Sequence, residues 1–389
     1  GALTDDDEDA CGADTACAVD DVIVLAKLDD LFYTTTSNSV AADSFTFYVH
    51  DGTGYSTSAY TMTITVTAVN DAPTVSDATQ ALTAIDEDGT PSTSTTISSL
   101  YTASFADAAD SDSLAGVCIT SYTEDTSEGQ WKYSTNDGVS FTAIANIGAA
   151  SAGLIIAAAD ELQFDPADDF NGAANTLTGV LIEDSAGSVS TDASTDDCSS
   201  TGGATVYSTA TVVLSHTVNA VNDLPANAGD TATATEDTSY DDWTADSAWG
   251  YTDVDGDAMV HVLIVTTVGA GSLAVDADAG NDCDSNELVV AGSTTINDED
   301  LANLEFCPAA DSVASTTFTY KVHDGTGYSP VGTMTISITA VDDNPVAGNT
   351  GDQTAYEDVA FSFQTVASTD VDGDTLSITC IETGSDMPG

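Results

Sequence analysis

The sequence contains no arginine and only three lysines, Lys27, Lys132 and Lys321, against 65 acidic residues. Its formal net charge is therefore −62 at pH 7. Nucleic acids and anionic membrane surfaces are bound through clusters of basic side chains, and this chain can form no such cluster. The composition excludes both as partners. Because so many carboxylates repel one another, dissolved or bound cations must balance them.

Two further absences indicate the fold class. No apolar run approaches the roughly 18 residues that a membrane-spanning helix requires, and the longest, 153–159 (GLIIAAA), predicts a buried strand. Residues that favour helices are scarce, whereas Thr, Val, Ser and Gly are abundant. With 42% apolar residues the chain is too hydrophobic for a disordered acidic tail, so we predict a folded all-β protein.

The chain also lacks an initiating Met and a signal peptide, so we expect a mature or excised piece. Its seven cysteines are scattered and form no Cys-x-x-Cys pair. Scattered cysteines in an acidic all-β chain predict disulfides and an extracellular or cell-surface location. Buried free thiols in a cytosolic protein are the alternative, and the sequence does not settle the pairing.

Internal repeats define the organisation of the chain. Segments 45–55 (FTFYVHDGTGY) and 318–328 (FTYKVHDGTGY) are nearly identical, and each precedes a run in which Thr or Ser alternates with Ile, Val or Met. Such alternation predicts a half-buried strand, and the HDGTG turn closes a hairpin. A diverged copy starts at Leu177 and leads to a strand expected at 210–221.

Acidic motifs recur in register with these strands. Each copy ends in an ND or DD pair followed by x-Pro, at 70–73, 222–225 and 342–345. An acidic pair follows each proline, and then comes a DVDGD motif before the next strand. The motif is complete at 253–257 and 370–374 but reduced to Asp110-Ser-Asp112 in the first full repeat.

Cutting at the proline elements predicts four pieces. Residues 1–69 are the C-terminal half of a repeat, 70–221 and 222–341 are complete repeats, and 342–389 is an N-terminal half. The first complete repeat carries an insertion at 185–205, which we expect to be a solvated loop. Two explanations of the halves stay open. The chain is one unit cut from a longer tandem array, which we favour, or the ends of neighbouring chains complete a split domain.

The order of ED, DxDGD, F-T-Y-x-V-x-D-G, T-I/V-T-V and VNDxP resembles the bacterial-type cadherin-like tandem repeats. The resemblance covers essentially the whole chain, and 162–172 (LQFDPADDFNG) is similar to a strand and turn of that family. It implies an all-β fold of tandem cadherin- or immunoglobulin-like Greek-key β-sandwich domains arranged end to end. It also implies calcium between successive domains, bound by linker Asn and Asp, an acid of the preceding domain and a DxD of the following one.

The residue types fit that chemistry independently of the resemblance. Ca²⁺ takes six to eight hard oxygen ligands at a flexible site, and Asp-x-Asp at a strand end can aim two carboxylates the same way. Only 12 of the 65 acids are Glu, so the bias is towards Asp, a short oxygen ligand. The proline after each linker acid stiffens the entry to the next strand. The alternative is that these acids form solvated turns and caps.

We therefore predict three calcium sites. The first comprises Asn70, Asp71, Asp110 and Asp112, with Asp51 as a further candidate. The second comprises Glu87, Asp88, Asn222, Asp223, Asp253, Asp255 and Asp257, with Asp184 as a further candidate. The third comprises Glu236, Asp237, Asp342, Asp343, Asp370, Asp372 and Asp374, with Asp324 as a further candidate. A separate loop, 276–287 (DADAGNDCDSNE), approximates EF-hand spacing without flanking helices.

Catalysis finds little support in the sequence. His50 and His323 occupy the same repeat position beside a hairpin turn, where we expect a structural role. No GxSxG, HExxH or nucleotide-binding motif occurs in a fitting context. A glycosidase carboxylate pair is possible by residue type, but the acids follow the repeat, whereas an active site is singular. Three tryptophans could line a carbohydrate surface, although core or domain-edge positions are the expected ones: Trp131, Trp243 and Trp249.

The sequence thus predicts a calcium-stiffened extracellular repeat protein, not an enzyme, with a structural or adhesive role in a filament, appendage or surface layer. Its partners would be copies of itself or neighbouring repeats of a longer chain, and glycans are a further possibility. One alternative is a carbohydrate-binding accessory module of a surface protein. Another is a halophilic surface protein whose acids serve hydration rather than metal sites.

Overall fold

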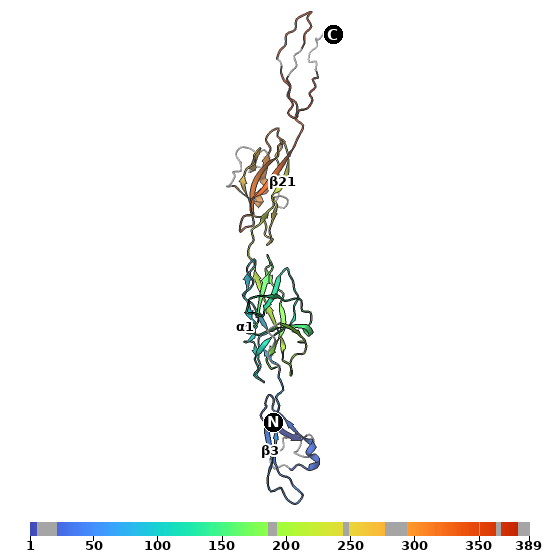
Figure 1. Cartoon of the computed structure of the whole chain (residues 1–389). Helices are drawn as coiled ribbons and strands as arrows, with labels where there is room; N and C mark the ends of the chain where they lie inside the picture. The colour runs from blue at the N-terminus through green and yellow to red at the C-terminus, as the bar shows by residue number, and fades with distance from the viewer. Residues whose placement is uncertain are drawn as a thin grey trace. The chain divides into compact units, whose positions relative to one another are not determined.

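The computed structural model describes residues 1–5, 22–185, 193–243, 249–276, 294–349, 351–362 and 367–379. The chain divides into two compact units, Gly1–Val221 and Asn222–Gly389. Figure 1 draws the strands of both units as arrows. The finer division at residues 69 and 341 stays a prediction. Apart from residue 276, the EF-hand-like loop lies outside the described residues.

Strands dominate the described residues, and the predicted all-β fold of tandem β-sandwich domains is confirmed. The helical segments are short, because Thr-, Ser- and Val-rich runs favour extended backbone. None of the described helices is long and apolar enough to span a bilayer. The helical segments are α1 (Ile97–Tyr101), η1 (Leu25–Asp30), η2 (Ala150–Ala152) and η3 (Asp298–Asn303).

Residues 1–69 contribute two separate antiparallel pairs to the first unit, β1 with β2 and β3 with β4. Beyond β3, the predicted HDGTG turn is present, because His50 and Tyr55 form an antiparallel bridge. The strands are β1 (Ala2–Asp5), β2 (Leu31–Thr34), β3 (Asp43–Phe47) and β4 (Tyr60–Ile64).

Residues 70–221 form sheets that enclose one hydrophobic core. A six-stranded sheet has the order β17-β13-β10-β16-β18-β6, a four-stranded sheet the order β12-β11-β14-β8, and a three-stranded sheet the order β15-β19-β7. Val117 and Leu181 from the first sheet lie in one buried cluster with Trp131 and Phe164 from the second. The early strand β6 pairs in parallel with β18, a late strand.

The strands of this repeat follow the sequence pattern closely. The apolar run at 153–159 forms β13, as predicted. The strands are β5 (Thr74–Val75), β6 (Thr79–Ala81), β7 (Ile85–Asp86), β8 (Thr95–Thr96), β9 (Phe105–Ala106), β10 (Leu114–Ser121), β11 (Gly129–Ser134), β12 (Thr142–Ala143), β13 (Gly153–Ala157), β14 (Glu161–Pro166), β15 (Gly172–Ala173), β16 (Leu177–Glu183), β17 (Ser194–Asp196), β18 (Tyr207–Ser215) and β19 (Thr217–Asn219).

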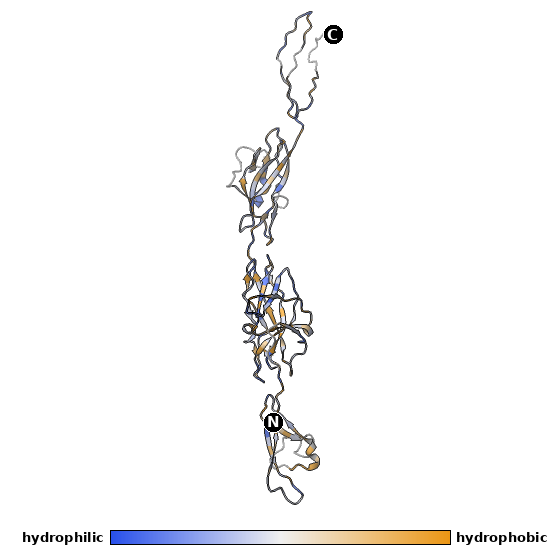
Figure 2. Cartoon of the chain, in the orientation of Figure 1, coloured by the Kyte–Doolittle hydropathy of each residue, from blue (hydrophilic) through white to orange (hydrophobic). Residues whose placement is uncertain are grey.

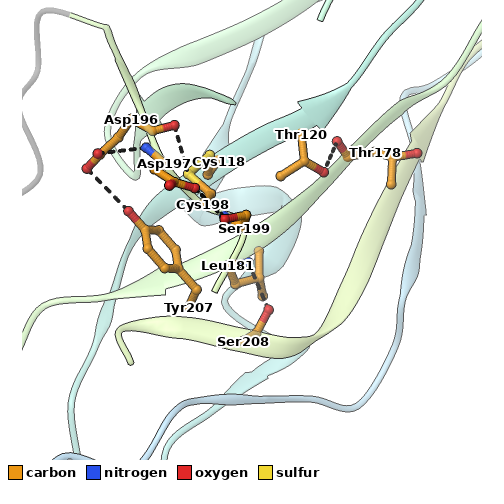
Figure 3. Close-up of a disulfide and its surroundings, with 10 residues drawn as sticks. All are labelled: Cys118, Thr120, Thr178, Leu181, Asp196, Asp197, Cys198, Ser199, Tyr207 and Ser208. Carbon is orange, nitrogen blue, oxygen red and sulfur yellow. Dashed lines mark hydrogen bonds between the residues drawn. A yellow bond between two sulfur atoms is a disulfide. The ribbon is translucent and has the colours of Figure 1, made fainter. Parts of the chain in front are cut away.

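Most of the described residues of the expected solvated loop at 185–205 are exposed, but the segment also contains a short strand and a buried cysteine. Strand β17 pairs with β13, and Cys198 is buried and disulfide-bonded to Cys118 of β10 (Figure 3). The disulfide packs with Ile155, Val180 and Ile182 in a second small apolar cluster. These side chains alternate with core residues along their strands, so the outer face of the sheet is apolar and needs a cover.

Residues 222–341 form a similar sandwich in the second unit. A five-stranded sheet has the order β21-β28-β27-β23-β25, and a separate pair joins β24 to β26. The hydrophobic residues of both complete repeats gather along their strands (Figure 2). The strands are β20 (Ala226–Asn227), β21 (Asp230–Thr235), β22 (Tyr251–Thr252), β23 (His261–Thr266), β24 (Ser272–Val275), β25 (Thr294–Asn297), β26 (Leu304–Cys307), β27 (Thr316–His323) and β28 (Gly332–Thr339).

The core of this repeat is aromatic. Trp243 and Trp249 are fully buried beside Phe318 and Tyr320 of β27, and Trp131 of the first unit is equally buried. The prediction that the tryptophans are core residues is confirmed. The described residues after β28 contain no strand, and one isolated bridge joins Val346 to Thr369.

Candidate metal centre

The third predicted site is the most fully assembled. Glu236 follows β21, is almost completely buried, and accepts a hydrogen bond at Oε1 from the Val341 amide at 2.9 Å. The amide of Asp343 donates to Asp372 Oδ2 at 2.7 Å. Glu236, Asp343 and Asp372 each place one carboxylate oxygen within 4.8 Å of the other two. Residues far apart in the sequence therefore present a concentrated set of hard oxygen ligands.

A second triad shares Asp343 with the first. Asp237, Asp311 and Asp343 also place carboxylate oxygens within 4.8 Å of one another. The Asp311 amide donates to Asp237 Oδ1 at 3.3 Å, which connects the turn after β26 with the turn after β21. Both Asp237 and Asp311 adopt positive φ, 57° and 56°, and Asp tolerates this region better than most residues. Sequence reasoning missed Asp311.

The remaining predicted ligands of this site lie in the DVDGD turn. The Asp374 amide donates to Asp370 Oδ1 at 3.0 Å, and Gly373 between the acids has φ 81°. The nearby charge of Asp370 raises the pKa of Asp374, and the side chain of Asp342 contributes to this rise. These acids therefore crowd one another, with Asp342 among them.

Electrostatics show that this cluster fits a cation. Burial raises the pKa of Asp343, and the neighbouring acids, Asp237 first, raise it further. Asp343 Oδ2 is buried and has no hydrogen-bond partner. A buried carboxylate oxygen without a donor is costly unless a positive charge compensates it. The five carboxylates of the two triads and their neighbours supply the oxygen set that Ca²⁺ prefers.

The second predicted site is divided between the two units. In the second unit, the Asp223 amide donates to Asp255 Oδ2 at 2.8 Å, which repeats the Asp343–Asp372 contact. Asp253, Asp255 and Asp257 place carboxylate oxygens within 4.8 Å of one another. The Asp257 amide donates to Asp253 Oδ1 at 3.1 Å.

Asn222 contacts Asp324, which the sequence suggested as a further candidate for the third site. Its Nδ2 donates to Asp324 Oδ2 at 3.1 Å, so the structure brings Asp324 to the second set instead. Burial opposes ionisation of Asp324, but hydrogen bonds from the Gly327 amide and from Asn222 outweigh it and lower the pKa.

The first unit holds the other part of the second set. Glu87 is buried and accepts from the Val221 amide at 2.5 Å and from Asn171 Nδ2 at 3.0 Å. The Asp169 amide donates to Asp88 Oδ1 at 3.2 Å. Glu87, Asp88 and Asp169 thus reproduce the arrangement of the corresponding ED pair and turn acid in the second unit.

The first predicted site contains an acid that the sequence analysis overlooked. The Asp71 amide donates to Asp110 Oδ2 at 2.6 Å, and Asp107 joins Asp110 and Asp112 in a triad within 4.8 Å. The DVDGD motif is therefore not missing an acid in this repeat, because Asp107 supplies the third. Ser111 takes positive φ, 68°, where the other two motifs have glycine.

Two further acids, Glu183 and Asp184, lie near this triad. Asn70 Nδ2 donates to Glu183 Oε1, and the Ser113 amide donates to Asp184 Oδ1 at 2.8 Å, so Asp184 belongs to the first site rather than the second. Burial raises the pKa of Glu183, and the charge of Asp107 contributes. Glu183 Oε2 and Asp107 Oδ2 are buried without a hydrogen-bond partner. Like the third site, this cluster has buried carboxylate oxygens without hydrogen-bond donors, so it also fits a cation.

Asp51 stays in its own turn. Its Oδ1 accepts from the Thr53 amide, the Thr53 hydroxyl and the Gly54 amide at 2.8, 2.7 and 2.8 Å. The Thr53 side chain and these amides lower the pKa of Asp51 to about 2.

The histidines of the two HDGTG turns have the structural role that the sequence predicted. His50 Nδ1 accepts from the Gly52 amide at 3.0 Å, and His323 Nδ1 accepts from the Gly325 amide at 2.9 Å.

The missed acids carried a signal that an alignment within the chain would have revealed. Segment 162–169 (LQFDPADD) corresponds to 304–311 (LEFCPAAD), which places Asp169 and Asp311 at one position. Asp107 was harder to find, because its spacing to Asp110 is one residue longer than the spacing within DVDGD.

No family model matches the chain, and no curated protein matches it. Solved structures similar to it include cadherin extracellular repeats. Mouse Cadherin-23 EC22-24 has 13% sequence identity and a TM-score of 0.42, over 87% of this chain and 86% of that one. Human CDH23 EC21-23 has 14% identity and a TM-score of 0.38, over 76% and 84%.

Protocadherin Gamma B2 extracellular cadherin domains 1-5 are also similar, with 11% identity and a TM-score of 0.39, over 85% of this chain and 52% of that one. The chain spans about half the length of that protocadherin structure. Because all three TM-scores lie below 0.5, the assignment of the fold rests on the sheets of each unit. Those sheets show tandem β-sandwich domains.

Proposed function

We propose that the chain is a calcium-stiffened extracellular repeat protein with a structural or adhesive role and no enzymatic activity. It would form part of a filament, appendage or surface layer. The observation that carries the proposal is the position of Asp343. Its buried Oδ2 has no hydrogen-bond partner, and four acidic residues from distant segments lie close to it. An ion at this point would neutralise carboxylates that otherwise repel one another.

The residues of the chain would act as follows. Glu236, Asp237 and Asp311 would hold the ion from the body of the repeat, and Asp343 and Asp372 from the segment that follows. Bound Ca²⁺ would supply the positive charge that makes the close approach of these carboxylates favourable. The hydrogen bond from the Asp343 amide to Asp372 orients the following segment before any ion binds.

Two observations bear on the alternatives. The three tryptophans are fully buried, so none of them offers a ring face to a sugar. Some of the acids in the described residues gather into triads, and this clustering supports metal sites over hydration alone. The extracellular location is supported by the buried Cys118–Cys198 disulfide, since disulfides persist in oxidising compartments.

The test is calcium binding by the whole chain at fixed ionic strength. We expect EDTA to lower the melting temperature, and we expect Asp343→Asn to reduce the calcium stoichiometry measured by calorimetric titration by at least one ion. Asp352→Asn removes the same charge from an exposed residue and should leave the stoichiometry unchanged. An unchanged melting temperature in EDTA contradicts the proposal. Complete replacement of calcium by sodium chloride would favour the halophilic alternative, and glycan binding that survives EDTA the carbohydrate-binding one.

A further inference from the structure

The outward positions of the five-stranded sheet in repeat 222–341 carry no acidic residue. Strand β21 ends in TATAT and β28 reads GTMTISIT, and their Ala, Met and Ile side chains pack into the core. Because side chains alternate along a strand, the Thr and Ser residues between them point outward. The outward residues of β27, β23 and β25 are Thr, Lys, His, Leu and Asn. We call this surface of the five strands the acid-free face.

This face also holds one of the three lysines of the chain. Lys321 lies on β27, the central strand of the sheet, opposite Leu263 of β23, and Leu263 lies opposite Thr295 of β25. With the residues that the structure describes, Lys321 forms no ion pair. The whole chain has 65 acidic residues against three lysines. The acid-free face therefore differs in charge from the chain as a whole.

Several polar groups of the acid-free face already have partners within it. The hydroxyls of Thr266 and Thr319 lie 2.7 Å apart, and the Thr339 hydroxyl donates to the Ala234 carbonyl oxygen at 3.1 Å. His261 Nε2 lies 2.9 Å from the Tyr328 hydroxyl. Burying a polar group that keeps its hydrogen bond costs little, and the threonine methyl groups supply apolar contact area. A second surface can therefore cover this face at a small desolvation cost.

The first complete repeat covers the equivalent face with its own chain. Val180 lies opposite Cys118 there, as Lys321 lies opposite Leu263 in the second repeat. Both Val180 and Cys118 are buried in a cluster that includes Cys198 of the insertion, which is held by the disulfide (Figure 3). Among the described residues, no buried apolar cluster of this kind forms on the acid-free face. This side of the sheet thus accepts a cover, and in the second repeat the place is open to a partner.

We propose that two copies of the chain pack their acid-free faces against each other across a two-fold axis. The argument for a second copy is charge. Contact through an acidic surface would force carboxylates of two chains, each of net charge −62, into one desolvated interface. The acid-free face avoids this repulsion, and the long stem of Lys321 can carry its ammonium to the rim of the contact, near the acidic surface of the other copy.

The size of the face predicts a weak, closed dimer. Five strands about 4.8 Å apart, at roughly 3.4 Å per residue, give a face of about 500 Å². Two such faces bury about 1,000 Å² in total, the lower limit for a specific interface. A two-fold contact of one face with itself closes after two copies, so it joins chains side by side. The inference rests on the structural role in the proposed function, but not on calcium.

The experiment compares the same substitution at one position of both repeats. Thr317 precedes Phe318 on the acid-free face, and Thr176 precedes the corresponding Leu177 in the first repeat; both threonines are exposed. Sedimentation velocity of the full chain over a concentration series, in about 0.5 M NaCl to screen long-range repulsion, should show dimers for the wild type and for Thr176→Asp. Thr317→Asp should need at least about tenfold higher concentration, because like charges then meet in the contact.

Lysine labelling locates the contact independently of any substitution. An amine-reactive reagent followed by peptide mass spectrometry reports the reactivity of each lysine. As the concentration of the wild type rises, Lys321 should become protected, whereas Lys132, which pairs with Asp165 in the first repeat, should keep its reactivity. Dimers that leave Lys321 as reactive as in the monomer, or that form equally well with Thr317→Asp, overturn the inference.

The remaining outcomes separate this inference from the proposed function. A wild type that is monomeric at every concentration overturns the dimer, while the calcium stoichiometry of the Asp343 cluster is tested independently. Dimers should persist in EDTA, because the face contains no predicted calcium ligand. Dimers that dissociate in EDTA while the repeat stays folded would place the contact at the acidic ends and overturn the inference. A monomeric wild type that binds a neutral glycan, with binding lost in Thr317→Asp, would identify a glycan as the occupant instead.

Discussion

The two complete repeats have the same arrangement of acidic residues at their ends, but their interiors differ. Both pair an early strand in parallel with a late one, and in both the ED glutamate accepts from a backbone amide just after the last strand. Among their differences are three: the first repeat has the buried Cys118–Cys198 disulfide, Ser111 stands in its acidic motif where the second repeat has a glycine, and His216 stands where the second repeat has Ile336. The arrangement of the acidic ends thus does not depend on this disulfide or on His216.

The disulfide is the largest of the three differences. Cys118 and Cys198 are separated by 80 residues, and both are buried. Closing a loop of that length restricts the unfolded chain and stabilises the fold by roughly 4 kcal/mol. The double change Cys118→Ala with Cys198→Ala should therefore lower the melting transition of repeat 70–221 in differential scanning calorimetry. The transition of repeat 222–341 serves as the internal reference and should stay in place; a shift of both would show that the repeats unfold together.

His216 is the second difference, and we expect its effect on stability to depend on pH. Its ring lies 5.1 Å from the ring of Phe164 and 6.3 Å from that of Trp131, and neither ring nitrogen has a partner. His216→Ile should stabilise the repeat by about 1–2 kcal/mol at neutral pH, because an unsatisfied buried polar group is removed. Ile336→His in the second repeat is the reciprocal change and should destabilise it.

The same substitution should remove an acid sensitivity of the first repeat. Burial lowers the pKa of His216, so the folded state binds this proton less readily than the unfolded state. Stability from the neutral ring is then present above the unfolded pKa of about 6.5 and lost as the pH falls below it. Urea unfolding at several pH values should show a steeper acid loss for the wild type than for His216→Ile; parallel curves would contradict this assignment.

Ser111 is the smallest difference. Its φ of 68° lies in the left-handed region, where Gly256 and Gly373 stand in the other two motifs at 78° and 81°. That conformation costs a non-glycine residue roughly 1–2 kcal/mol, offset in part by the greater entropy that glycine loses on folding. Ser111→Gly should stabilise its repeat by about 0.5–1 kcal/mol in urea unfolding. Gly256→Ser, whose side chain would meet open space, should cost a similar amount.

Much of the fold could be predicted because it depends on short-range patterns. Alternation of Thr with Ile or Val predicted β28, and the HDGTG segments form the turns that their composition predicted. The insertion at 185–205 could not be predicted in the same way. The burial of Cys198 in this insertion depends on the apolar outer face of β13 and β16, which is visible only once the sheet has been assembled.

The candidate site, too, could be predicted only in part from the sequence. Sequence repetition identified the linker acids, the ED pairs and the DVDGD motifs. Asp107, Asp169 and Asp311 escaped, and Asp184 and Asp324 were assigned to the wrong sets, because their places depend on which turns meet at one end of a sandwich. Whether the assembled clusters bind calcium stays a prediction.

The sequence by itself determined the all-β class, the repeat period and the excess of acidic ligands, since each follows from local alternation, turn chemistry and residue type. Only the tertiary structure decided which carboxylates share one cluster and which hairpin is covered. Burial belongs to the partner strands rather than to the segment itself, so 45–55 and 318–328, nearly identical in sequence, differ in their exposure.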